Sequence, residues 1–214
     1  IKDRGSKVGA FVGATIEELM GVNSRVQLSQ AEAIMRKRIN KRHMDNGVTI
    51  INPENTYIEA NVQIGKDTII EPGVMLRGNT EIGEECIIGM NSSITNSKIG
   101  NFTEVKISTI IDSAVGPYAY LRPKSNVGNH VKIGDFVEVK NANIGDYSKA
   151  SHLSYIGDAD VGKDVNIGCG VVFVNYDGKN KFRSVVEDGA FIGSNSNLVA
   201  PVHVKHKGYI ATGS

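Results

Sequence analysis

His152 is the residue of this sequence best suited to moving a proton. Histidine ordinarily titrates at a pH of about 6.5, so its imidazole can act as a general base near neutral pH. Of the five histidines, only His152 lies in a segment that also carries Lys149 and Tyr155. The other four lie on a presumed helix, in a turn and near the C-terminal end (His43, His130, His203 and His206). A base at His152 could take the proton from an amine that attacks an acyl group.

Arg122 and Lys140 have the charge and chemistry that suit a phosphate group. Arginine binds phosphate through paired hydrogen bonds, whereas lysine binds it as a compact charge. The two residues are 18 positions apart. Whether they can act on one phosphate depends on the structural element that carries them.

A six-residue repeat runs through most of the chain. A branched aliphatic residue followed directly by glycine occurs twelve times between residues 64 and 193, mostly at multiples of six or one short of them. A helix would repeat about every 3.6 residues and an exposed strand every two, so neither explains the pattern. The repeat is typical of a solenoid built from hexapeptides.

Three hexapeptides close one triangular coil of about 18 residues, whose inward aliphatic side chains stack on those of the next coil. The inward positions run from Ile58 and Ile64 to Val204 and Ile210, and about eight coils fit between residues 48 and 214. The glycine suits a bend where a side chain would clash or where φ must be positive. On such a coil Arg122 and Lys140 stack on one face. A right-handed β-helix or a sandwich of short strands remains as an alternative.

A different pattern precedes the repeat. Apolar residues at i, i+3, i+7 and i+11 (Leu28, Ala31, Met35 and Ile39) predict an amphipathic helix within residues 24–46. Asn23 or Ser24 can cap its start, and Gly47 can end it. We therefore predict a linker α-helix over residues 23–47. Residues 1–22 are too short to fold alone, and we expect them to be the end of a preceding domain.

The composition gives no sign of a nucleic-acid or membrane partner. The 24 basic residues balance the 23 acidic ones, and no secretory signal or membrane-length apolar run is present. Cys86 and Cys169 lie far apart in the sequence, on different coils of the expected solenoid, which favours two reduced thiols over a disulfide. We expect a soluble, cytoplasmic protein.

Several motifs outside the bare repeat are more specific. They are residues 21–25 (GVNSR), 121–123 (LRP), 134–140 (GDFVEVK), 148–155 (SKASHLSY) and 175–178 (NYDG). In this order the motifs resemble those of bacterial bifunctional enzymes that combine glucosamine-1-phosphate N-acetyltransferase and N-acetylglucosamine-1-phosphate uridylyltransferase activities. The resemblance covers nearly the whole chain. It implies an all-β fold, a left-handed parallel β-helix over residues 48–214, and a homotrimer with active sites between subunits.

The resemblance also implies an activity: transfer of acetyl from acetyl-coenzyme A to glucosamine 1-phosphate, in the synthesis of UDP-N-acetylglucosamine for cell-wall precursors. It makes His152 the proton acceptor. The substrate would be bound by Arg122, Lys140, Tyr155, Asn166 and Lys181. The coenzyme would contact Cys169, Asn175, Tyr176, Ser194 and Thr212. Cys169 is interpreted as a small packing residue rather than a nucleophile, because the family transfers acetyl directly. The polar loop after Phe173 breaks the repeat and could reach a neighbouring subunit.

The chain departs from the resembled family in three ways. It lacks the uridylyltransferase domain, so Mg²⁺ is expected for that domain only, and Asn23 would be a vestigial metal position without its partners. Between residues 112 and 117 relatives often carry about one more hexapeptide, which makes closure of the coil there uncertain. The chain also ends before the last coil and basic tail that contribute to coenzyme binding in relatives, so the sequence leaves open whether this fragment is active or inactive.

Other functions remain open from the sequence. A zinc-dependent hydratase can use the same fold but needs three converging histidines, and His130 and His152 lack an evident third. A non-catalytic scaffold would bind neither substrate. Another hexapeptide acyltransferase would use a different acceptor.

Overall fold

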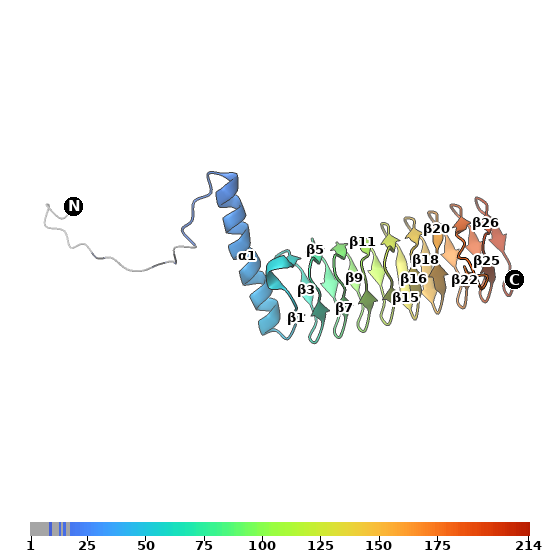
Figure 1. Ribbon diagram of the computed structural model, residues 1–214, viewed down its shortest axis with the longest axis horizontal. Coiled ribbons are helices and arrows are strands. Elements are labelled where there is room, and N and C mark those ends of the chain that lie inside the picture. The colour runs from blue at the N-terminus through green and yellow to red at the C-terminus, as the bar shows by residue number, and fades with distance from the viewer. Residues whose placement is uncertain (1–8, 10–12, 14, 16–17) are drawn as a thin grey trace.

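A three-sided prism makes up most of the chain in the computed structural model, which describes residues 9, 13, 15 and 18–214 (Figure 1). One α-helix, α1 (Arg25–Asp45), precedes the prism, and a short 3-10 helix, η2 (Pro53–Asn55), lies in the first coil. The predicted architecture, a parallel β-helix of hexapeptide repeats preceded by a helix, is confirmed. The expected domain remnant at residues 1–22 lies largely outside the described residues.

Each side of the prism is a parallel sheet of nine short strands. Face A contains β1 (Thr49–Ile50), β4 (Ile69–Ile70), β7 (Ile87–Ile88), β10 (Glu104–Val105), β13 (Tyr120–Leu121), β16 (Glu138–Lys140), β19 (Tyr155–Gly157), β22 (Val172–Val174) and β25 (Asn197–Val199). Face B contains β2 (Tyr57–Ile58), β5 (Met75–Arg77), β8 (Ser93–Thr95), β11 (Thr109–Ile111), β14 (Asn126–Val127), β17 (Asn143–Ile144), β20 (Ala159–Val161), β23 (Ser184–Val186) and β26 (His203–Val204). Face C contains β3 (Gln63–Ile64), β6 (Glu81–Ile82), β9 (Lys98–Ile99), β12 (Ala114–Val115), β15 (Lys132–Asp135), β18 (Lys149–His152), β21 (Asn166–Ile167), β24 (Phe191–Ile192) and β27 (Tyr209–Ile210).

The prism has nine coils, one more than the estimate from the sequence. Several coils are shorter than three full hexapeptides: Glu104 pairs with Tyr120, 16 positions on, and Lys132 pairs with Lys149, 17 positions on. The short coils offset the longer interval of 25 positions between Val172 and Asn197, so the nine coils still average about 18 residues.

The inward aliphatic side chains form one continuous core, as the repeat predicts. Ile70, Leu76, Ile88 and Leu121 are fully buried. Ile64 and Ile210 are only partly buried, because β3 and β27 are the edge strands of face C and have a neighbouring coil on one side only. The period of six thus identifies the core residues. The two exceptions, Ile64 and Ile210, lie in the first and last strands of face C.

Most of the glycines that directly follow an inward residue are required by the close approach of the next coil and not by a positive φ; Gly116, with a φ of 87°, is an exception. A Cβ atom placed on Gly134 would lie 1.9 Å from the carbonyl oxygen of Ser151 in the next coil. The positive φ falls two residues later, at Phe136, where φ is 56°. Of the two explanations offered by the sequence, steric clash is therefore the one that applies at this position.

Buried serine and threonine hydroxyls join successive coils. The Ser148 hydroxyl donates to the Gly162 carbonyl at 2.7 Å and accepts from the Val165 N–H at 3.0 Å. We expect Ser148→Ala to lower the free energy of unfolding by about 1–3 kcal/mol, because both backbone groups lose a buried partner. Urea denaturation measures this. Ser93→Ala, at a partly exposed position on β8, is the control, and an equal loss in both variants would contradict the explanation.

Helix α1 begins and ends close to the predicted bounds, but its predicted apolar stripe is wrong in part. Ser24 caps its start by accepting a hydrogen bond from the Gln27 N–H. Leu28 and Met35 are about half exposed, and the helix buries Asn40 and His43 instead. Only the C-terminal half of the helix packs against the first coil, as Figure 1 shows. The Asn40 amide donates to carbonyls of that coil. No helix among the described residues is both long and apolar enough to span a membrane.

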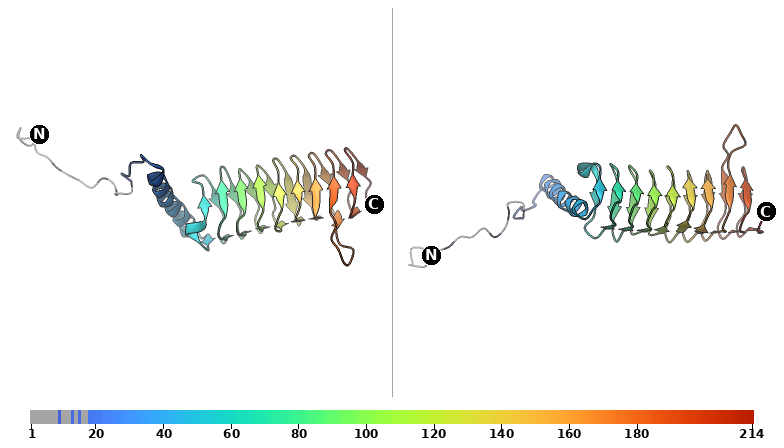
Figure 2. Two further views of the ribbon diagram at one scale, coloured as in Figure 1. Left: turned by 45° about the horizontal axis from the view of Figure 1, so that its top comes forward. Right: turned by 90° about the horizontal axis from the view of Figure 1, so that it is seen from below.

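The coil that includes residues 112–117 is closed. Strand β12 pairs with β9 and β15, and β13 pairs with β10 and β16, so no side of the prism is missing there. The repeat is interrupted instead between β22 and β23, where the chain leaves the prism as a protruding loop (Figure 2). We call this excursion, residues 175–183, the hairpin loop.

Candidate functional site

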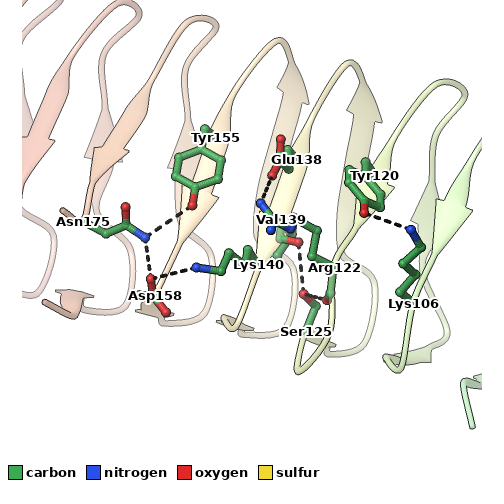
Figure 3. Close-up of polar contacts among 10 residues, drawn as sticks. All are labelled: Lys106, Tyr120, Arg122, Ser125, Glu138, Val139, Lys140, Tyr155, Asp158 and Asn175. Carbon is green, nitrogen blue, oxygen red and sulfur yellow. Dashed lines mark hydrogen bonds and ion pairs between the residues drawn. The ribbon is translucent and has the colours of Figure 1, made fainter. Parts of the chain in front are cut away.

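Arg122 and Lys140 occupy the same position on adjacent coils, as their spacing predicts. Leu121 pairs with Val139 in face A. Arg122 directly follows Leu121, and Lys140 directly follows Val139. The Arg122 guanidinium contacts the Glu138 carboxylate at 2.9 Å. Figure 3 shows both side chains at the edge where face A turns into face B. The fold therefore brings two cations to one edge.

Asp158 is the centre of the polar contacts at this edge. Its carboxylate accepts from the Asn141 amide at 2.6 Å. It also accepts from the Asn175 amide and pairs with the Lys140 ammonium at 3.5 Å (Figure 3). The Asn175 amide also contacts the Tyr155 hydroxyl at 3.3 Å. Because the side chains of Lys140 and Asp158 are only 19% and 12% exposed, salt screens their pairing less than that of surface charges.

Acid should weaken this network. Burial by itself would raise the pKa of Asp158, but the Asn141 hydrogen bond, the Lys140 charge and the Asn175 hydrogen bond outweigh it and lower the pKa below its usual value. A depressed folded-state pKa stabilises the fold above the unfolded-state value of about 3.9, and this contribution is lost as pH falls through the folded-state pKa. We expect the stability of the wild type relative to Asp158→Asn to decline below about pH 4. Urea denaturation of both proteins from pH 6 to pH 2 measures it, and a constant difference would contradict the assignment.

Lys181, at the end of the hairpin loop, adds a third cation to the cluster. The neighbouring Lys140 ammonium lowers the pKa of Lys181. The positive charge of Arg122 also lowers the pKa of Lys181. Three cations close enough to perturb one another form a site that favours an anion with more than one negative charge.

His152 lies at the opposite edge of face A, where face C ends. It is the last residue of β18, and its ring Nδ1 lies 3.8 Å from the carboxylate of Asp135, its register partner on β15. The ring is about 60% exposed, and among the described residues no contact joins it to the cation cluster. Lys140 pairs with Gly157, and the three residues of β19 (Tyr155–Gly157) span face A, so the two edges are on the order of 10 Å apart.

The same corner position continues along the prism beyond His152. Ala150 pairs with Ile167, Ile167 with Ile192 and Ile192 with Ile210. The residues two positions after these form a column at the edge between faces C and A: His152, Cys169, Ser194 and Thr212. The Cys169 thiol is free and exposed. Three candidate coenzyme contacts thus line up with the candidate base, although each comes from a different coil of the prism.

The remaining candidate residues contact neither the cation cluster nor His152 in the hydrogen bonds of the described residues. Asn166 lies on β21 of face C and pairs with Lys149. Tyr176 is half exposed, and its hydroxyl donates to the Gly178 carbonyl within the hairpin loop. The Asn23 backbone N–H donates to the Gln27 side chain. Among the described residues no group of three or more His, Cys, Asp or Glu side chains could hold a metal.

Sequence reasoning missed Asp135 and Asp158. Both could have been found from the length of a coil. Asp135 precedes His152 by one coil, and Asp158 lies one coil after Asn141 and one coil before Asn175. Residues at that separation stack on adjacent coils, as the register of β15 and β18 shows.

Comparison with known proteins gives matches over the whole chain. The family model described as bacterial transferase hexapeptide (six repeats) matches residues 61–96. The bifunctional protein GlmU of Clostridioides difficile is 76% identical over 100% of this chain and 48% of its own length, and that of Alkaliphilus oremlandii is 66% identical over the same shares. The chain thus spans about half the length of these relatives. The alignments run over 220 positions, six more than the 214 residues of the chain, which is the length of one hexapeptide.

Solved structures are more distant. The UDP-N-acetylglucosamine acyltransferase of Arabidopsis aligns with 78% of this chain and 65% of its own at 16% identity, with a TM-score of 0.46. A likeness at this level carries no information about the substrate.

Proposed function

This chain belongs to the family of the bifunctional protein GlmU, and from that premise we propose that it transfers acetyl from acetyl-coenzyme A to glucosamine 1-phosphate. The product is N-acetylglucosamine 1-phosphate, a precursor of UDP-N-acetylglucosamine. One observation carries the proposal: Arg122 and Lys140 stack at one edge of face A while His152 lies at the other.

The substrate lies over face A, and side chains from both edges reach inward to it, because its amine and its phosphate are on neighbouring carbons. Its phosphate sits at the edge with face B, where Arg122 supplies paired hydrogen bonds and Lys140 and Lys181 supply compact charges. The Tyr155 hydroxyl, held by Asn175, lies on the strand between the two edges and can contact the sugar. Asn166 contacts the sugar or the reacting carbonyl. The amine then points toward His152.

His152 performs the proton transfer. The neutral amine attacks the thioester carbonyl, a C–N bond forms, and the imidazole takes the proton from nitrogen as the C–S bond breaks and the coenzyme thiolate leaves. Asp135 stabilises the positive imidazolium that results. The proton passes finally to the thiolate or to solvent, so the reaction needs no further reactant.

The coenzyme runs along the column that starts at His152. Cys169, Ser194 and Thr212 continue that column on successive coils. Asn175 and Tyr176 lie at the start of the hairpin loop, at the other edge of face A, where they would contact the coenzyme bound to a neighbouring subunit. The placement lets the thioester meet the amine next to the base. Cys169 needs no covalent role in this arrangement.

The chain functions as a cytoplasmic homotrimer with sites between subunits. Exposed aromatic side chains support self-association: the rings of Phe102, Tyr118 and Phe136 stack along one corner of the prism, and Tyr118 is 49% exposed. Covering such a ridge with a second copy buries apolar surface. Light scattering should give about three times the 23.0 kDa of one chain, and a monomer at micromolar concentration would refute the trimer.

Mg²⁺ serves only the uridylyltransferase activity of the longer relatives. Asn23 offers one amide oxygen, whereas Mg²⁺ takes about six oxygen ligands. The described residues near Asn23 do not fit the ion, and no step of acetyl transfer uses it.

The decisive experiment is a thiol-release assay of this chain with acetyl-coenzyme A and either glucosamine 1-phosphate or glucosamine. We expect release that depends on the phosphate, because the cation cluster has no other partner on the acceptor. Equal rates with both would favour another acceptor, and calorimetry that detects binding of neither substrate would favour a scaffold. Stoichiometric zinc by elemental analysis would favour the hydratase.

A further inference from the structure

The hairpin loop is ordered by its own hydrogen bonds. Tyr176 and Lys181 form an antiparallel bridge, and the Phe182 N–H donates to the Asn175 carbonyl at 2.8 Å. At the tip, the Asp177 carboxylate accepts from the Lys179 and Asn180 N–H groups at 2.7 and 2.6 Å. Such a hairpin moves as a unit, so its direction depends on how its two ends are attached.

The first end is attached to Asp158. The Asn175 amide donates to the same carboxylate that Lys140 and Asn141 contact, and Asn175 is buried (Figure 3). The start of the loop is therefore tied to the residue that holds one of the cations.

The second end is attached to Asp160, two residues further along the same coil. The Arg183 guanidinium makes paired hydrogen bonds to the Asp160 carboxylate, from Nε at 2.5 Å and Nη2 at 2.6 Å. It also donates to the carbonyls of Asn141 and Ala159 at 2.9 and 2.8 Å. Paired contacts of this kind fix orientation as well as distance.

Asp160 is itself held in place by the prism. The Asn143 amide donates to Asp160 at 2.6 Å, and the Asn126 amide donates to Asn143 at 2.9 Å. These three residues stack on adjacent strands of face B. The guanidinium thus docks on a carboxylate whose position the fold determines.

We propose that Asp158 and Asp160 clamp the two ends of the hairpin loop and that Arg183 is a positioning residue, which holds Lys181 beside Lys140 in the phosphate subsite. The inference rests on the proposed function for the identity of the ligand. It assigns Arg183 no contact with substrate. Arg183 holds the Lys181 side chain in its binding position before the substrate arrives. Without Arg183, the loop that carries Lys181 would lose conformational entropy on binding.

The experiment compares Arg183→Ala, Arg183→Lys and Asp160→Asn with the wild-type chain. Hydrogen exchange of the peptide covering residues 175–183 reports the order of the loop, and calorimetry with glucosamine 1-phosphate reports affinity. Lys163→Ala is the matched control, because it removes an ion pair with Asp146 (3.2 Å) elsewhere on the prism. We expect Arg183→Ala to speed exchange and to raise the Kd about tenfold, the size of effect of one charge-assisted hydrogen bond. Arg183→Lys and Asp160→Asn should fall in between, because each keeps part of the contact.

Unchanged exchange in Arg183→Ala would overturn the clamp, and faster exchange with unchanged affinity would overturn its link to Lys181. If Lys163→Ala changed exchange and Kd as much as Arg183→Ala, a general loss of stability would explain both variants, and this outcome would also count against the proposal. If the wild-type chain binds no glucosamine 1-phosphate, the proposed function fails, and the exchange data alone then decide whether the clamp exists.

Discussion

We expect His152→Ala to lower the turnover of acetyl transfer by about 10²- to 10⁴-fold, the contribution of a positioned general base. The affinity for glucosamine 1-phosphate should change little, because the cations that bind the phosphate lie at the other edge of face A. Thiol release under substrate saturation measures turnover, and calorimetry measures affinity. A large loss of affinity with unchanged turnover would reverse the roles assigned to the two edges.

His130→Ala is the matched control for this variant. His130 is also a half-exposed histidine paired with a carboxylate, since its Nδ1 lies 3.1 Å from Asp112. Its ring packs at a tilt against Tyr147 at a corner between faces B and C, away from the proposed site. Turnover of His130→Ala should remain within about twofold of the wild type, as is usual for surface substitutions. If both variants lose activity equally, the assignment of His152 as the base is wrong.

Arg122→Ala should raise the Kd for glucosamine 1-phosphate by about 10²-fold, because paired hydrogen bonds to a dianion are lost and Glu138 is left beside the phosphate. Arg122→Lys should lie between this variant and the wild type, since it keeps the charge but not the planar fork. Calorimetry with glucosamine 1-phosphate and with inorganic phosphate separates the phosphate contribution from that of the sugar. The loss should shrink at high salt.

Lys106→Ala controls for the loss of a cation at the same face position. Lys106 follows β10 one coil earlier and contacts Glu104 at 2.6 Å and the Tyr120 hydroxyl at 3.1 Å. We expect a change in Kd of less than about threefold, because Lys106 lies two coils from Lys140 and its ammonium is a surface charge with partners of its own. An effect as large as that of Arg122→Ala would mean that the phosphate responds to the general field of the prism rather than to a defined subsite.

The sequence by itself determined the prism, its core and the stacking of Arg122 on Lys140. A period of six leaves one face of each short strand apolar, and only a closed three-sided coil buries every such residue. Residues that are one coil apart in the sequence then come into contact, which is why the column from His152 to Thr212 could also have been derived from the repeat.

Only the tertiary structure shows the position of the hairpin loop and the buried face of α1, because both lie outside the hexapeptide repeat. The hairpin loop has no period, so the docking of Arg183 on Asp160, and hence the place of Lys181, follows from hydrogen bonds between residues up to 42 positions apart. The apolar positions of α1 likewise predicted a buried stripe, yet Leu28 and Met35 are exposed because only the end of the helix meets the prism. A repeating pattern predicts burial where each coil packs on an identical neighbour. The position of a loop and the burial of a helix face depend instead on the other surfaces of the protein that they contact.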